Sequence, residues 1–346
     1  MKTHFMTSKS ASTPRATGFS LIELMISITI GLLLVAGMAT LISNSSAQRN
    51  EMEKSGRQIE NGRYAMQILS DDLRHAGYYG EYYSFGAVPA TLPDPCSTTL
   101  ADLPTALPLS VQGYDAPSTL PTVLATCIGD ANHVSGTDVL VVRRTSTVVS
   151  GSGLVAGRVY LQTRNDSYVL NDGSAAAATW NLKKRNGTTS ADIRQLVVHV
   201  YFISPCSMPA SGTSCTGASD DGGAPIPTLK RLELTNTGST RSMVVTPLVE
   251  GIENLQIDYG TDSLNSGMPN NFVMSPADTT AWGNVVSARV QLVARNTEST
   301  TGFTDSKTYN MGMAGTFTPV AAVQKYKRHA YTQLVRLENP SARREQ

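Results

Sequence analysis

The sequence has 346 residues, of which 40% are hydrophobic, and its 28 Lys and Arg residues nearly balance its 27 Asp and Glu residues. This balance argues against a protein that binds nucleic-acid phosphates through a strongly basic surface. The length is sufficient to bury a substantial hydrophobic core.

Residues 1–18 form a basic leader, and an apolar segment follows from Phe19 to Ile42. The leader holds three cations and no acid, so its removal leaves 25 cations against 27 acids, a formal charge of −2. At ~1.5 Å per residue the apolar segment gives about 36 Å of helix, enough to cross ~30 Å of hydrocarbon. Three interpretations are open: a secretory signal cleaved after Ser45–Ala47, a permanent single-pass anchor, or a leader cut before Phe19. The apolar run is longer than the ~7 to 15 residues usual in a secretory signal.

One acid, Glu23, lies inside this apolar segment. An unpaired carboxylate is costly in hydrocarbon, so an acid kept there usually has a partner and a function. Gly18-Phe19 followed by Ser20-Leu21-Ile22-Glu23 closely resembles the type III leader site of type IV pilins and type II secretion pseudopilins. The resemblance implies cleavage of the Gly18–Phe19 bond, N-methylation of Phe19, and pairing of Glu23 with the Phe19 amine of an adjacent subunit.

Beyond the membrane segment (19–42), the helix is predicted to continue over residues 43–77. No proline interrupts it, and small or apolar residues recur at alternating steps of three and four, which is typical of an amphipathic helix. These residues are Met52, Ser55, Ile59, Gly62, Met66, Leu69, Leu73 and Ala76. Glycines from Gly77 to Gly80 predict the end of the helix, and Gly56 and Gly62 predict a bend or local loosening.

The rest of the chain is predicted to form an irregular connecting loop (78–135), a β-rich head (136–340) and a tail (341–346). The connection is rich in Pro, Thr, Ser and Gly. Runs of β-branched residues predict strands at Asp138–Thr145, Arg158–Thr163, Arg194–Ile203, Leu229–Thr235 and Ser242–Val249. Three later segments, Asn254–Tyr259, Ala288–Arg295 and Val335–Glu338, alternate apolar and polar residues, which predicts one buried face opposite a polar face. The expected fold class is α+β, with a long N-terminal α-helix packed on an enlarged antiparallel β-sheet head.

The four cysteines, Cys96, Cys127, Cys206 and Cys215, follow the apolar segment and are expected on the side of the membrane opposite the basic leader. Four thiols allow three pairings, and proximity favours Cys96 with Cys127 and Cys206 with Cys215. Each disulfide would add ~2 to 4 kcal/mol of stability. Zinc is the alternative, but no two cysteines have the two-residue spacing typical of four-thiolate sites.

Within the head, a second resemblance narrows the family. Val249–Gly260 looks like a signature of PilW-type minor pilins, and Trp282 with Val285–Arg295 and the ending Arg328–Leu337 fit the same pattern. With Phe19–Gly80, the resemblance covers most of the chain but not the connection or the early part of the head. It implies a pilin-like fold and a low-copy subunit with an elaborate head rather than a shaft subunit.

The resemblance also implies a function. The chain would help to prime type IV pilus assembly in the bacterial inner membrane, as a single-pass protein with a periplasmic head, and would then enter the fibre at or near its tip, where pili support twitching motility. The implied partners are other minor pilins, the major pilin, the prepilin peptidase and the inner-membrane assembly platform. No cofactor and no nucleic acid are expected.

Two other functions are open. A type II secretion minor pseudopilin of the J type carries a similar head on a helix, and its loss would trap exoproteins in the periplasm rather than abolish twitching. The head could also be a tip adhesin or a DNA-uptake receptor. The short basic tracts Lys183–Arg185 and Lys325–Arg328 are interpreted as solvated surface turns.

Enzymatic or metal-binding activity is not expected. The five histidines show no metal-ligand spacing, and there is no Gly-x-Ser-x-Gly elbow or phosphate-binding loop. His75 is expected on the helix surface and His199 in the core. A weak calcium signal without EF-hand spacing comes from Asp258, Asp262 and Asn265, and from Asp220 and Asp221.

Overall fold

A computed structural model describes residues 18–83, 86–151 and 153–345. The expected leader therefore lies outside the described residues, apart from its last residue, Gly18. The chain divides into two units, Met1–Glu53 and Lys54–Gln346. A long apolar helix followed by a mostly antiparallel β head confirms the α+β class.

Helix α1 (Leu21–His75) ends two residues before the predicted limit. Gly77 follows with φ 71°, a left-handed conformation that ends helices and that glycine adopts without a Cβ penalty. Its N–H donates to the carbonyl oxygen of Arg143 at 2.8 Å, so the chain is attached to the sheet where the helix ends.

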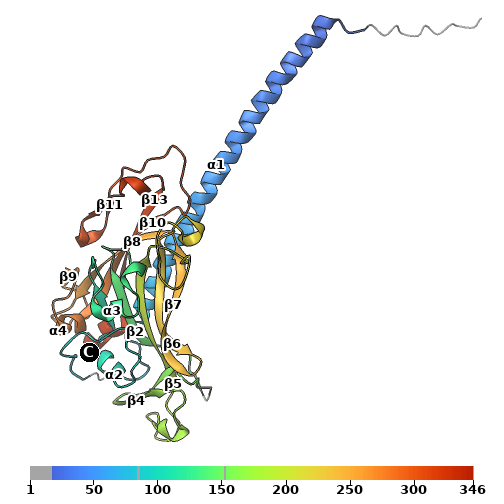
Figure 1. The fold of residues 1–346 in the computed structure, drawn as a ribbon. Helices are drawn as coiled ribbons and strands as arrows, with labels where there is room; N and C mark the ends of the chain where they lie inside the picture. The colour runs from blue at the N-terminus through green and yellow to red at the C-terminus, as the bar shows by residue number, and fades with distance from the viewer. Residues whose placement is uncertain (1–17, 84–85, 152, 346) are drawn as a thin grey trace, which may run out of the picture. The chain divides into compact units, whose positions relative to one another are not determined.

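The head contains a seven-stranded and a four-stranded sheet, so its strands are divided between two layers (Figure 1). The first has the order β1-β2-β5-β3-β4, with β6 paired to β5 and β7 to β6. Its strands are β1 (Val111–Tyr114), β2 (Val139–Thr145), β3 (Val159–Arg164), β4 (Ser167–Asp172), β5 (Ile193–Ser204), β6 (Thr228–Thr237) and β7 (Thr240–Glu250). The second, ordered β13-β10-β8-β9, comprises β8 (Ile252–Thr261), β9 (Asn271–Val273), β10 (Val285–Arg295) and β13 (Arg328–Arg336).

The main hydrophobic core joins the C-terminal part of α1 to both sheets. Ala65, Leu69 and Leu73 of the helix are fully buried in one cluster with side chains of β2, β5, β8 and β10. The amphipathic pattern was correct from Gly62 onward but wrong earlier, because Met52 is 69% and Ile59 44% exposed.

The connecting segment covers the other face of the seven-stranded sheet, where Val139 and Val141 pack with Leu103, Leu107 and other apolar residues. The prediction of a wholly irregular loop over 78–135 was therefore wrong. The segment contains α2 (Leu103–Ala106), β1 and α3 (Thr122–Ala125). The expected tail, 341–346, also differs, since α5 (Glu338–Arg344) runs into it.

The polar face of the four-stranded sheet is covered as well, although alternation suggested that it faces outward. Asp258 and Gln291 are 1% exposed, and Gln291 Nε2 donates to Asp258 Oδ2 at 2.8 Å. The segment between β10 and β13, with the short strands β11 (Tyr309–Asn310) and β12 (Thr316–Phe317), folds over them: the Met313 N–H donates to Asp258 Oδ1 at 3.3 Å. A further short helix, α4 (Thr279–Gly283), precedes β10.

Gly62 is a packing position rather than a hinge, since α1 is continuous there. A Cβ at Gly62 would lie 2.2 Å from Cε2 of Tyr331 on β13, whereas one at Gly56 would meet nothing within 4 Å. We expect Gly62→Ala to destabilise the head by about 1–3 kcal/mol through overpacking. Gly56→Ala should stabilise the helix by about 0.5–1 kcal/mol.

Urea unfolding of the two variants in detergent provides the measurement, with each serving as the control for the other. Equal stabilisation by both substitutions would show that Tyr331 moves away from the helix without cost.

Candidate functional site

The bond between Gly18 and Phe19 lies in a short non-helical stretch before α1. Both residues are exposed, Phe19 by 86%, and no other part of the described chain comes within 4 Å of a Cβ built on Gly18. A non-helical, exposed peptide bond before the start of a helix is accessible to a protease.

Glu23 has a hydrogen-bonding partner within its own chain. Its Oε2 accepts from the Ser20 N–H at 2.9 Å, and its own N–H donates to Ser20 Oγ at 3.4 Å. This is a capping box, in which the side chains of Ser20 and Glu23 each satisfy a helix-terminal N–H. The sequence interpretation missed this contact, although the Ser-x-x-Glu spacing is a signal for it.

The apolar side chains from Phe19 to Ile42, nearly all of them on α1, lie on the surface of the chain. The large ones are between 53% and 86% exposed, and the helix is long and apolar enough to cross a membrane. An apolar surface that surrounds a helix requires lipid or other helices around it. Together with the leader motif, this indicates that the chain is anchored in a membrane.

In the head, a buried acid of α1 attaches the helix to the seven-stranded sheet. Asp72 Oδ1 accepts from Arg144 Nε at 2.6 Å, and Asp72 Oδ2 accepts from the Tyr201 hydroxyl at 2.9 Å and lies 2.7 Å from His199 Nδ1. His199 is a satisfied core residue, as expected, whereas the burial of Asp72 was not foreseen. His75 lies on the helix surface, also as expected.

Asp72 and His199 shift each other's pKa. Burial by itself would raise the pKa of Asp72, but His199 and Arg144 hold it well below its usual value. Burial would likewise lower the pKa of His199, yet Asp72 and Glu233 raise it. The carboxylate and the imidazolium therefore stabilise each other inside the fold.

Asp138 carries a second perturbed carboxyl group. Its oxygens accept from the N–H groups of Ala116 at 2.8 Å and Ile257 at 2.7 Å, but burial outweighs these bonds and, with the charges of Asp115 and Asp258, raises its pKa to about 7. The ionised form is thus disfavoured in the folded head.

We expect the free energy of unfolding to be highest near pH 4 and to fall from there towards pH 8. His199 contributes its full stabilisation below its unfolded pKa of 6.5, and this stabilisation is lost as the pH rises through its raised folded pKa. Asp138 also stabilises the fold less as the pH rises from 3.8 to about 7, because its carboxyl group ionises more readily in the unfolded chain than in the fold. Asp72 has the opposite effect on stability, but only below about pH 4: there its stabilising contribution decreases as the pH falls and its carboxylate becomes protonated.

Urea midpoints of the protein in detergent between pH 5 and 8 measure this slope. Asp138→Asn should flatten it, and a midpoint that increases from pH 5 to 8 would contradict the assignment.

The structure pairs the cysteines as proximity favours, Cys96 with Cys127 and Cys206 with Cys215. Asp220 lies beside the second disulfide, but oxidised sulfurs offer no thiolate to a metal. Two other calcium candidates hold loops: Asp221 accepts from three backbone N–H groups, and Asp262 accepts from those of Leu264 and Gly267.

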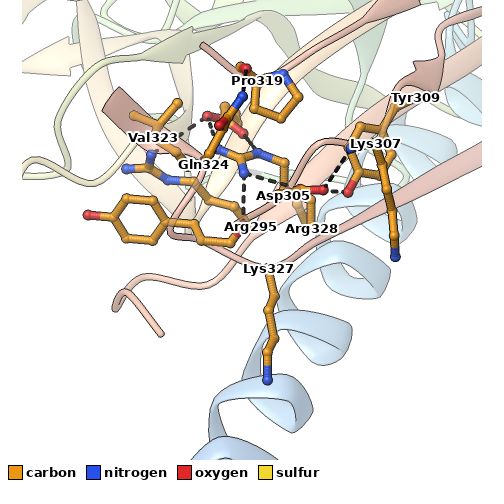
Figure 2. Close-up of polar contacts among 12 residues, drawn as sticks. Arg295, Asp305, Lys307, Tyr309, Pro319, Val323, Gln324, Lys327 and Arg328 are labelled. Atoms are coloured by element: carbon orange, nitrogen blue, oxygen red, sulfur yellow. Dashed lines mark hydrogen bonds and ion pairs between the residues drawn. The ribbon is translucent and has the colours of Figure 1, made fainter. Parts of the chain in front are cut away.

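One residue of the expected basic surface tracts is buried. Figure 2 shows the Arg328 side chain directed at Asp305 and at the carbonyl group of Val323, with Nη1 3.3 Å from Asp305 Oδ2 and Nη2 2.7 Å from the Val323 oxygen. Glu253 forms a second, two-pronged ion pair with it. The interpretation of Arg328 as a solvated cation was wrong; it holds the segment between β10 and β13.

Comparisons with known families agree with these features at both ends of the chain. The model of the Prokaryotic N-terminal methylation motif matches residues 13–39, which include Gly18, Phe19 and Glu23. The model of the family Type IV Pilus-assembly protein W matches residues 216–339, from the second disulfide to the start of α5. No curated protein shows a significant match to the chain. The two matches are consistent with a type IV pilin-like protein of the PilW type, and they support a minor pilin related to the type IV pilus.

Proposed function

We propose that this minor pilin helps to prime type IV pilus assembly in the inner membrane and is incorporated at or near the pilus tip. The observation that carries the proposal is the position of Glu23 in the first turn of α1, four residues after the expected new terminus at Phe19, in a stretch whose large apolar side chains are exposed as far as Ile42.

The physical role follows from the cost of starting a fibre. The first few subunits lack neighbours for their apolar helices and for Glu23, so the nucleus is unfavourable. Cleavage after Gly18 creates a cationic amine at Phe19, the partner that a carboxylate in hydrocarbon requires. Before assembly, the contact with Ser20 satisfies Glu23; during assembly, the Phe19 amine of a neighbouring subunit takes over.

The head supports the other parts of the proposal. It contains two disulfides, which persist in the periplasm but rarely in the cytoplasm. Its seven-stranded sheet is covered on one side by α1 and on the other by the connecting segment, which makes an elaborate head. We propose a structural role without catalysis, in contact with other minor pilins, the major pilin, the prepilin peptidase and the assembly platform.

Mass spectrometry of the amino-terminal peptide tests the proposal. We expect a methylated Phe19 in both the membrane fraction and sheared fibres. A start at Gln48 would indicate a secreted soluble protein and contradict the mechanism.

Deletion of the gene separates the two pilin-like roles. Loss of surface pili, with the major pilin retained in the membrane, supports priming. Normal piliation with exoproteins trapped in the periplasm would assign the chain to type II secretion.

A further inference from the structure

A cavity of about 620 Å³ lies between the connecting segment and the seven-stranded sheet. Strands β4 and β5 contribute Tyr168, Leu196 and Val198 to it, and residues 86–97 and 102–108 form the opposite side. Its volume falls within the ~300–1,000 Å³ of typical small-molecule sites, and most of its lining is apolar.

One cation, Arg143 of β2, lines this cavity. It follows Val139 and Val141 on the same face of the strand, because side chains alternate with a period of two. Arg143 is 2% exposed. Its Nη1 donates to the Leu109 carbonyl oxygen at 3.2 Å and its Nη2 to Gln112 Oε1 at 2.8 Å, and both acceptors are neutral.

This environment differs from that of the other buried arginines. Three arginines are buried among the described residues, and the other two, Arg295 and Arg328, each lie within 4 Å of Glu253. No carboxylate in the described part of the chain lies within ion-pair distance of Arg143. Buried guanidinium groups are normally paired, because an uncompensated charge in the interior is costly. Burial lowers the pKa of Arg143, and Asp94, which lies beyond ion-pair distance, opposes this shift only in part.

We infer that Arg143 is the anchor of a binding site for a small organic monocarboxylate. The carboxylate group supplies the missing partner of the guanidinium, which has three N–H donors beyond its two bonds to neutral acceptors. The apolar part of the ligand occupies the space beside Leu196 and Val198.

Asp94 selects a singly charged ligand. It lines the same cavity, and its Oδ1 accepts from the Cys96 N–H at 2.8 Å. Arg143 offsets the repulsion between Asp94 and one ligand carboxylate, whereas a second negative charge would find no further cation among the described residues of the lining, which favours a monocarboxylate over phosphate. The site is independent of the amino-terminal assembly mechanism.

Isothermal titration calorimetry of the full-length chain in detergent tests the site with benzoate, benzamide and inorganic phosphate. Benzoate should bind saturably, and benzamide, which has the same shape without the charge, should bind at least about tenfold more weakly. Equal binding of benzoate and benzamide, or binding of phosphate as tight as that of benzoate, would overturn the assignment.

Variants locate the site. Arg143→Gln should remove the preference for benzoate over benzamide, and Leu92→Trp, at the exposed rim of the cavity, should weaken benzoate binding while leaving the guanidinium in place. The exposed Arg185→Gln is the matched control and should bind benzoate as the parent does. If Arg143→Gln does not fold, Leu92→Trp and the comparison of the two ligands remain decisive, and unchanged binding by Leu92→Trp would contradict the site.

Discussion

Replacing Glu23 with alanine is expected to leave the protein in the membrane but to remove it from pili. The apolar surface from Phe19 to Ile42 is unchanged by the substitution, so anchoring persists. The Phe19 amine of a neighbouring subunit would lose its carboxylate partner in hydrocarbon, which costs about 3–5 kcal/mol when one member of a buried pair is removed. We therefore expect copurification of other minor pilins to fall by at least about a hundredfold, since 1.4 kcal/mol corresponds to tenfold.

Two further variants show which property of Glu23 matters. Glu23→Gln keeps an acceptor for the Ser20 N–H but has no charge, so it separates the capping box from the ion pair. We expect it to fail like the alanine variant if charge is decisive. Glu60→Ala, at an exposed position of the same helix, is the matched control and should assemble normally. Unchanged piliation by Glu23→Ala at equal expression would refute the pairing.

Replacing Asp72 with alanine should destabilise the head by about 3–5 kcal/mol. The substitution removes the acceptor of three side chains and leaves the cations of Arg144 and His199 without their shared carboxylate. Thermal or urea unfolding of the full-length chain in detergent, followed by near-ultraviolet circular dichroism, measures the loss. We also expect the variant to lose the stability that depends on the protonation of His199.

The neighbouring Asp71 is a suitable control. Its side chain is 55% exposed, and its only ion pair among the described residues, with Arg74, has a distance of 3.9 Å. Asp71→Ala should therefore change the free energy of unfolding by less than about 1 kcal/mol. Similar losses for the two variants would show that the Asp72 network does not hold the helix on the sheet.

The two adjacent aspartates show why the sequence predicted part of the head and not the rest. The spacing of Leu69, Leu73 and Ala76 marks a packing face, and it correctly placed these residues in the core. Periodicity cannot show that Asp72 is also buried, because its partners Arg144 and Tyr201 are separated from it by 72 and 129 positions along the chain. The pairing of β2 with β5 brings Arg144 and Tyr201 close to each other, and the packing of α1 on these strands adds Asp72.

The same distinction applies to the strands. Runs such as Asp138–Thr145 and Arg194–Ile203 were predicted within one or two residues of β2 and β5, because β-branched residues favour an extended backbone locally. The sequence pattern wrongly predicted that the polar face of β8 is exposed. The segment that covers Asp258 comes more than fifty residues later in the chain, so no local pattern could show the burial of this face.

The sequence by itself determined the apolar helix, the acid at Glu23 and the cleavage motif at Gly18, because each is a pattern of neighbouring residues. Their roles depend on the surrounding lipid rather than on contacts with distant parts of the chain. Tertiary structure decided which charges are buried and how they are satisfied: Asp72 and Arg328 are paired, and Arg143 meets only neutral acceptors. The burial of these charged side chains results from the packing of segments that are distant in sequence, so a local sequence pattern cannot predict it.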